Sequence, residues 1–150
     1  MITATWQIRI ARPPEQVFDF VADLRNEPQF NPDASNVVQE SPGPIGLGTV
    51  YTEDFKRIGS FRTTIDRYER PSALGFDARN PKADANVQFT FTLVGDGETD
   101  VGCTVTLTMK GAMRLMERVM RGTVQRQIES SRGPMLKRAL ESQPASAGSA

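Results

Sequence analysis

The sequence predicts an α+β domain in which one long C-terminal helix lies on a sheet of short strands. After Gly111, apolar residues recur on one side of a helical wheel centred on Met116. From Val37 to Lys110, short runs alternate apolar and polar residues at the period of a strand. A helix with one apolar face has to bury that face against the sheet. A strongly curved sheet would leave a hollow beneath the helix, and this hollow is the predicted functional site.

The N-terminal stretch is predicted to form a strand and two short helices. Apolar residues occupy every second position of the strand, at Ile2, Ala4, Trp6, Ile8 and Ile10. Pro13 and Pro14 end it, and proline suits the first turn of the helix that follows. The inward face of that helix carries Val17, Phe18 and Val21. Asp23 is expected to cap the second short helix.

Six further strands are expected before the long helix. Their alternating residues fall within 36–40, 49–55, 61–67, 74–76, 87–93 and 103–109. Matching the faces of the second and third of these strands puts Phe55 opposite Phe61 and Glu53 opposite Thr63. The expected hairpin loop is then 57–59, where Gly59 can adopt a positive φ.

The long helix is predicted to turn one apolar face to the sheet and one basic face to solvent. The sheet-facing residues on the wheel are Met113, Met116, Val119, Met120, Thr123, Val124 and Gln127. The opposite side carries Arg114, Arg118, Arg121 and Arg132. Pro134 removes one helical hydrogen bond, so we expect a kink near 131–134 or a separate final turn.

Length and composition favour one domain and exclude several functions. The 150 residues suit a single domain, predicted at 1–141, with 142–150 as a small, polar, disordered tail. The 18 basic and 18 acidic residues balance, which gives no indication of nucleic-acid binding. Without histidine, the chain has no His-based triad or His metal site. Cys103 is the only cysteine, and no signal peptide or membrane-spanning run is evident, so a cytoplasmic location is expected.

The residues predicted to line the hollow are those that point inward by alternation. From the strands these are Trp6, Tyr51, Glu53, Phe55, Phe61, Thr63, Phe76, Phe89, Phe91, Cys103, Val105, Leu107 and Met109. From the helix they are Met116, Met120, Thr123, Val124 and Gln127. A mostly apolar wall with a few polar groups is typical of a small-molecule pocket. The alternative is a solid core filled by the same side chains.

Glu53 is the main candidate for chemistry. Strand parity places its carboxylate between Tyr51 and Phe55 on the concave face. If Glu53 is buried, its pKa rises and it can exchange a proton with a ligand carbonyl or enol, with the Tyr51 hydroxyl beside it. If the rim is wet, Glu53 is an ordinary exposed acid. Cys103 lacks a histidine partner, so we expect a buried thiol rather than a nucleophile.

Three segments carry a resemblance to a known family: IARPPEQVFDFVAD at 10–23, PQFNP at 28–32 and GLGTVY at 46–51. The chain from Met1 to Leu140 resembles the START/Bet v 1-like (SRPBCC) superfamily, in its polyketide cyclase/dehydrase-like branch. Phe30 departs from the pattern, because many relatives have tryptophan there. The resemblance implies a helix-grip fold, in which a curved antiparallel sheet of about seven strands wraps around the C-terminal helix.

The first functional hypothesis is a protein that binds a small hydrophobic ligand of the lipid, polyketide or aromatic type between sheet and helix. The second is a polyketide cyclase/dehydrase-like enzyme with Glu53 and Tyr51 as catalytic residues. The third, also implied by the resemblance, is an interaction module like the quinone-binding toxin-like relatives. No cofactor, metal, nucleic acid or stable membrane insertion is expected, and the oligomeric state stays open. The region 110–141 has eight basic and three acidic residues, a local charge of +5 that fits a solvated face or contact with an anionic membrane or partner.

Overall fold

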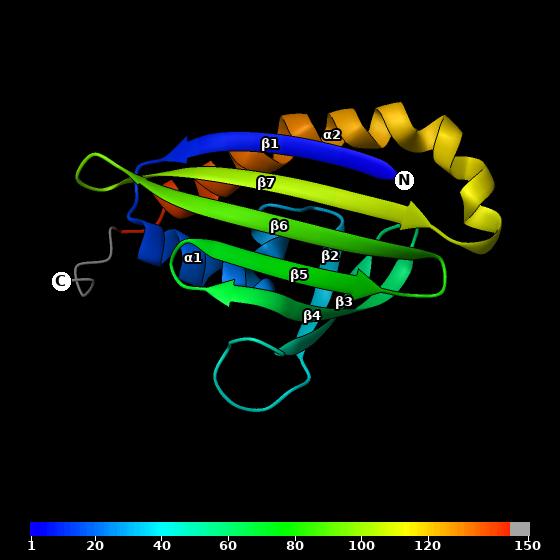
Figure 1. The fold of residues 1–150 in the computed structure, drawn as a ribbon, viewed down its shortest axis with the longest axis horizontal. Coiled ribbons are helices and arrows are strands. Elements are labelled where there is room, and N and C mark those ends of the chain that lie inside the picture. Colours follow the sequence, from blue (N-terminus) through cyan, green and yellow to red (C-terminus); the bar gives the residue numbers. More distant parts are fainter. Residues whose placement is uncertain (145–150) are drawn as a thin grey trace.

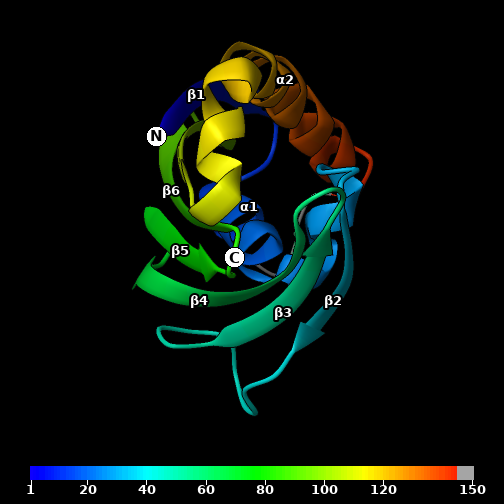
Figure 2. The same ribbon diagram turned by 90° about the vertical axis from the view of Figure 1, so that its right-hand side faces the viewer.

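The computed structural model, which describes residues 1–144, is built on one curved antiparallel sheet of seven strands in the order β1-β7-β6-β5-β4-β3-β2. The strands are β1 (Ile2–Ile10), β2 (Ala34–Gln39), β3 (Val50–Phe55), β4 (Gly59–Glu69), β5 (Ala73–Arg79), β6 (Ala83–Val94) and β7 (Glu98–Met109). Seen from the end, the sheet bends around an interior that helices close on the other side (Figure 2). The predicted α+β, helix-grip architecture is confirmed.

Two short helices follow β1, as predicted. They are α1 (Pro14–Ala22) and the 3₁₀ helix η1 (Leu24–Gln29). Pro14 occupies the first turn of α1. The Asp23 carboxylate accepts a hydrogen bond from the Arg25 backbone N–H at 3.1 Å, which confirms it as the cap of η1. The two helices fill one end of the concave face and carry Val17, Phe18 and Leu24 into the core (Figure 1).

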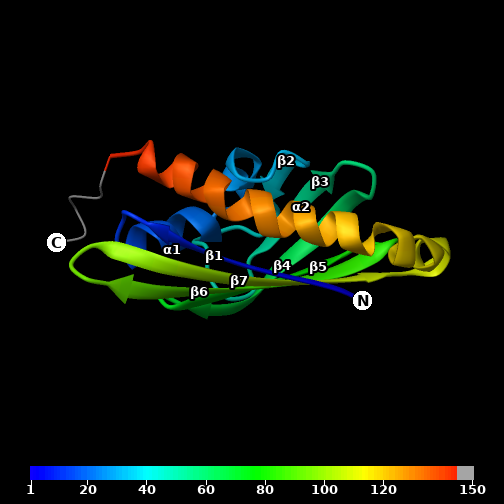
Figure 3. The ribbon, with the colours of Figure 1, turned by 90° about the horizontal axis from the view of Figure 1, so that it is seen from above.

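The long helix α2 (Arg114–Glu141) follows a short 3₁₀ turn, η2 (Gly111–Met113), and runs along the edge strand β1 (Figure 3). Two of its glutamate side chains accept hydrogen bonds from backbone N–H groups, one in β1 and one just after it. The Thr5 N–H donates to Glu129 Oε2 at 3.0 Å, and the Ala11 N–H donates to Glu141 Oε2 at 2.8 Å. Leu136 and Leu140, on the same half of the helix, are fully buried. The C-terminal half of α2 therefore sets the rotation of the whole helix about its own axis, and so determines which residues face the sheet.

The predicted inward face of α2 is only partly correct in its first half. Met116 and Val119 are exposed, and Thr123 is exposed as well. Met113, Met120 and Val124 turn toward the interior as predicted, and Glu117 and Ile128 join them. The first turns of α2 carry apolar residues on two sides, one facing the interior and one facing solvent. A helical wheel centred on Met116 merges these two sides into a single predicted face.

Two further predictions near the C-terminus need correction or qualification. The helix continues through Pro134 without a second helix or separate final turn. The Ser131 hydroxyl donates to the Gln127 carbonyl in the turn before it. The predicted tail begins at Ser142, but the carbonyl oxygens of Gln143 and Pro144 accept hydrogen bonds from Arg12 and Gln16. The rest of that tail lies outside the described residues.

The β3–β4 hairpin has a different register from the prediction. Glu53 pairs with Phe61, and Phe55 pairs with Gly59, so the turn contains 56–58. The register differs by two residues along one strand. Because side chains alternate with a period of two, the shift leaves every residue on its predicted face. Phe55 and Phe61 still meet edge to face, with ring centroids 5.4 Å apart.

Candidate functional site

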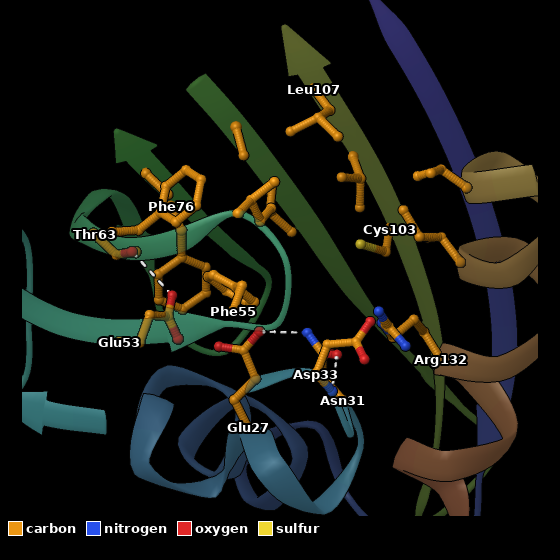
Figure 4. Close-up of a pocket in the computed structure, with 18 of the residues that line it drawn as sticks. Glu27, Asn31, Asp33, Glu53, Phe55, Thr63, Phe76, Cys103, Leu107 and Arg132 are labelled. Atoms are coloured by element: carbon orange, nitrogen blue, oxygen red, sulfur yellow. Dashed lines mark hydrogen bonds between the residues drawn. The ribbon is translucent and has the colours of Figure 1, made fainter. Parts of the chain in front are cut away.

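A cavity of about 230 Å³ lies between the concave face of the sheet, η1 and α2 (Figure 4). An apolar cavity of roughly 150 Å³ is already large enough to bind benzene. The cavity is therefore large enough for an organic molecule with at least one ring.

Most residues predicted to line the hollow do lie in the cavity wall. They are Trp6, Glu53, Phe55, Phe61, Thr63, Phe76, Phe89, Cys103, Val105, Leu107, Met109, Met120, Val124 and Gln127. An aromatic row forms part of this wall. Phe89 packs edge to face with Trp6 at 6.0 Å on one side and with Phe76 at 6.3 Å on the other, between ring centroids. Such a row offers ring edges and faces to a flat ligand.

Tyr51, Phe91, Met116 and Thr123 were also expected in the wall, and the structure places them elsewhere. Tyr51 points under α1, where its hydroxyl donates to the Ala22 carbonyl at 2.9 Å. Burial raises the pKa of Tyr51 to about 12. Phe91 stacks on Phe89 and packs against Phe18 in the core, while Met116 and Thr123 face outward with the first half of α2. The tyrosine is thus a structural tie between sheet and helix, not a group at the cavity.

Glu53 is 3 % exposed and forms part of the cavity wall. Its Oε1 accepts a hydrogen bond from the Thr63 hydroxyl at 2.9 Å, and its carboxyl group lies close enough to the Glu27 carboxyl group for the two to share a hydrogen bond. Burial raises the pKa of Glu53 far above its usual range, and the nearby Glu27 carboxylate raises it further. At neutral pH Glu53 is therefore a neutral acid, able to share its proton with Glu27 or to donate a hydrogen bond to a ligand oxygen.

Glu27 belongs to a second polar group that the sequence did not indicate. It lies on η1, and its Oε1 accepts a hydrogen bond from Asn31 Nδ2 at 3.1 Å (Figure 4). The Asp33 backbone N–H in turn donates to Asn31 Oδ1 at 3.2 Å. All three residues line the cavity. No periodic signal could have found them, because the 3₁₀ helix and the loop after it follow neither the helix period nor the strand period.

Arg132 faces this group from α2 (Figure 4). The prediction that it points away from the sheet is wrong, because the rotation of α2 is set by Leu136 and Leu140 rather than by Met116. Burial lowers the pKa of Arg132, and the negative charges of Asp33 and Glu27 oppose that effect. The wall therefore offers a cation opposite two carboxylates, in addition to the neutral acid at Glu53.

The turn of the β3–β4 hairpin contributes Lys56, Arg57 and Ile58 to the cavity. Lys56 and Arg57 are exposed, so they stand at the rim. The expected register placed the loop one residue later and so missed Lys56. Arg57 adopts a φ of 76°, a conformation that a tight turn imposes and that side chains other than glycine rarely adopt.

The remaining chemistry of the site is limited. Cys103 lies in the wall as a buried free thiol, and burial raises its pKa, so it is poorly suited to act as a nucleophile. Residues 1–144 contain no cluster of three or more His, Cys, Asp or Glu side chains arranged to hold a metal ion. Within the same residues, no helix combines the length and hydrophobicity needed to cross a bilayer.

Several solved structures share this fold over nearly the whole length of the chain. A START superfamily protein from Mycobacterium smegmatis is similar with a TM-score of 0.71 at 14 % identity, covering 93 % of this chain and 97 % of that one. The Zhui aromatase/cyclase from Streptomyces sp. R1128 gives a TM-score of 0.70 at 14 % identity, covering 97 % of each chain. Truncated norcoclaurine synthase from Thalictrum flavum gives 0.69 at 8 % identity, covering 95 % of this chain and 94 % of that one. At these identities the similarity shows the shared fold.

No protein of curated function matches the sequence. The family described as "Polyketide cyclase / dehydrase and lipid transport" matches residues 1–140, which span every strand and nearly all of α2. The chain therefore belongs to this polyketide cyclase-like family of the START/Bet v 1-like (SRPBCC) superfamily.

Proposed function

We propose that this protein binds a small, largely apolar molecule that carries a polar oxygen. The observation that carries the proposal is the pair of carboxyl groups of Glu53 and Glu27, placed in a largely apolar cavity wall. A ligand oxygen that accepts a hydrogen bond from this carboxyl pair would gain about 1.5–3 kcal/mol, the range for hydrogen bonds that involve charged groups. The apolar body of the ligand would lie along Trp6, Phe76 and Phe89.

The ligand classes that fit are lipid, polyketide and aromatic molecules of modest size. Family membership supports this range, because the family description includes both polyketide chemistry and lipid transport. A closed, filled core would favour the third hypothesis, the interaction module, whereas the cavity favours the first two.

Binding is tested with the apolar fluorophore N-phenyl-1-naphthylamine and two matched variants of α2. Met120→Trp places a large ring in the cavity wall and should weaken probe binding by at least about fivefold, since overpacking costs roughly 1–3 kcal/mol. Met116→Trp, one helical turn earlier and facing solvent, should leave probe affinity unchanged. Equal probe affinity in both variants would refute the cavity as the binding site.

A second candidate function is proton-transfer catalysis of the cyclase/dehydrase kind. It is favoured by the convergence of Glu53 and Glu27, because two interacting carboxyl groups in one pocket suit an acid and a base in the same reaction. The neutral Glu53 would donate a proton to a ligand oxygen, and the Glu27 carboxylate would accept one from carbon or from water.

Native mass spectrometry of protein purified from its host distinguishes the two functions. A carrier releases the same small molecule from the wild type and from Glu53→Gln. A dehydrating enzyme retains its substrate in Glu53→Gln, and that species is heavier by one water than the product on the wild type. Recovery of an identical molecule from both proteins would rule out catalysis by Glu53.

A further inference from the structure

The first turns of α2 present large apolar side chains to solvent. Leu115 is 82 % exposed, Val119 is 76 % exposed and Met116 is 47 % exposed. They occupy neighbouring positions on the outer side of the helix, where residues three and four apart lie next to each other. Figure 1 shows these turns, drawn in yellow, extending beyond the end of the sheet. We call Leu115, Met116 and Val119 the α2 crest.

Arginines flank the crest on one side. Arg114 and Arg118 are exposed and lie beside Leu115 on the helical wheel. Between 111 and 128 the only acidic residue is Glu117, which is buried on the opposite side of the helix and paired with the terminal ammonium of Met1. The exposed surface of these turns therefore combines apolar and positively charged groups, with no exposed carboxylate among them.

We propose that the α2 crest docks on an anionic phospholipid membrane. A helix that lies in the membrane interface inserts apolar side chains among the acyl chains and keeps its cationic side chains at the phosphates. Leu115, Met116 and Val119 would supply the first part of this interaction. Arg114 and Arg118 have long apolar stems, so their guanidinium groups can reach the phosphates while the stems stay in apolar surroundings. Each such cation adds about fivefold to the affinity for a negatively charged surface.

The charge of the crest argues against a second copy of the chain as its occupant. A symmetric dimer would place the same patch on both sides of the interface. Arg114 and Arg118 would then meet their own counterparts in apolar surroundings, without carboxylates to compensate them. Lipid phosphates supply that compensation.

The location of the crest connects docking with the cavity. Met120 and Val124 line the cavity from the next turns of the same helix. Docking through the crest would bring this wall close to the acyl chains, so an apolar ligand could pass between bilayer and cavity over a short path.

Vesicle co-sedimentation with the full chain tests the proposal. The wild type should bind phosphatidylcholine vesicles that contain phosphatidylglycerol and should not bind pure phosphatidylcholine vesicles. The double variant Leu115→Glu/Val119→Glu should weaken binding to the anionic vesicles by at least about tenfold. Arg114→Gln/Arg118→Gln should weaken it by roughly twenty-five-fold at low salt.

Leu93→Glu is the matched control, because Leu93 is also exposed but lies near the β6–β7 turn, at the other end of the sheet from the crest (Figure 1). Its vesicle binding should equal that of the wild type. Binding of N-phenyl-1-naphthylamine should be unchanged in both double variants. This result would separate an effect on membrane docking from an effect on the cavity. The proposal is overturned if the wild type does not bind anionic vesicles, or if Leu93→Glu loses as much vesicle binding as Leu115→Glu/Val119→Glu. It is also overturned if light scattering shows that Leu115→Glu/Val119→Glu converts a dimer to a monomer while vesicle binding stays unchanged.

Discussion

Replacing Glu53 by Gln should change the pH dependence of stability in a way that no exposed glutamate can match. In the folded chain the pKa of Glu53 is raised by burial and by Glu27, whereas in the unfolded chain it is near the ordinary value of about 4.3. Above that value the folded state holds a proton that the unfolded state has released. Stability is therefore lost as pH rises from the unfolded pKa toward the raised folded pKa.

The magnitude follows from linkage. Each pH unit within this window costs about 1.4 kcal/mol, so the wild type should lose up to about 2.7 kcal/mol between pH 5 and pH 7 through Glu53 alone. Glutamine has the shape of the neutral acid and can still accept the Thr63 hydrogen bond, but it does not ionise. Glu53→Gln should therefore gain stability relative to the wild type as pH rises, with no gain below about pH 4.

Urea unfolding at several pH values between 4 and 7 measures the effect, with the free energy of unfolding extrapolated to water. Glu98→Gln, an exposed position on β7, is the control and should follow the wild-type curve. A difference between Glu53→Gln and wild type that stays constant over this range would refute the conclusion that Glu53 is held protonated.

Two more predictions concern residues that shape the site without binding a ligand. Tyr51→Phe removes the bond to the buried Ala22 carbonyl and should cost about 1–3 kcal/mol of stability, but it should leave probe affinity unchanged, in contrast to a residue that contacts the ligand. A loss of probe affinity at full stability would contradict this structural role. Gly133→Val should destabilise the protein by roughly 1–3 kcal/mol, because a Cβ there would lie 3.3 Å from side chains of β1, while Gly122→Val on the open side of α2 serves as control. Equal unfolding midpoints for the two glycine variants would show that α2 does not pack closely on β1.

The strand-borne part of the site could be predicted because strand parity is robust. Glu53 and Phe55 face the cavity in the structure even though the predicted register of their hairpin was wrong. A shift of two residues preserves the face of every side chain, so the alternation of apolar and polar residues was sufficient. The same argument failed for Tyr51, because parity gives the face of the sheet but not which helix covers it.

The helix-borne part depended on contacts that are distant in sequence. The first turns of α2 are apolar on two sides, so the wheel gave no unique inward direction. The buried side chains of Leu136 and Leu140 and the hydrogen bond from the Thr5 N–H to Glu129 select one rotation of the helix. This rotation brings Arg132 into the cavity wall and leaves Leu115 in solvent.

The sequence alone determined the α+β class, the order of elements and which strand residues line the concave face, because these follow from local periodicity and turn residues. The tertiary structure decided the rotation of α2, the approach of Glu27 to Glu53 and the size of the cavity. These depend on packing between segments far apart in the chain, and the energy of that packing is not encoded in the pattern of any one segment.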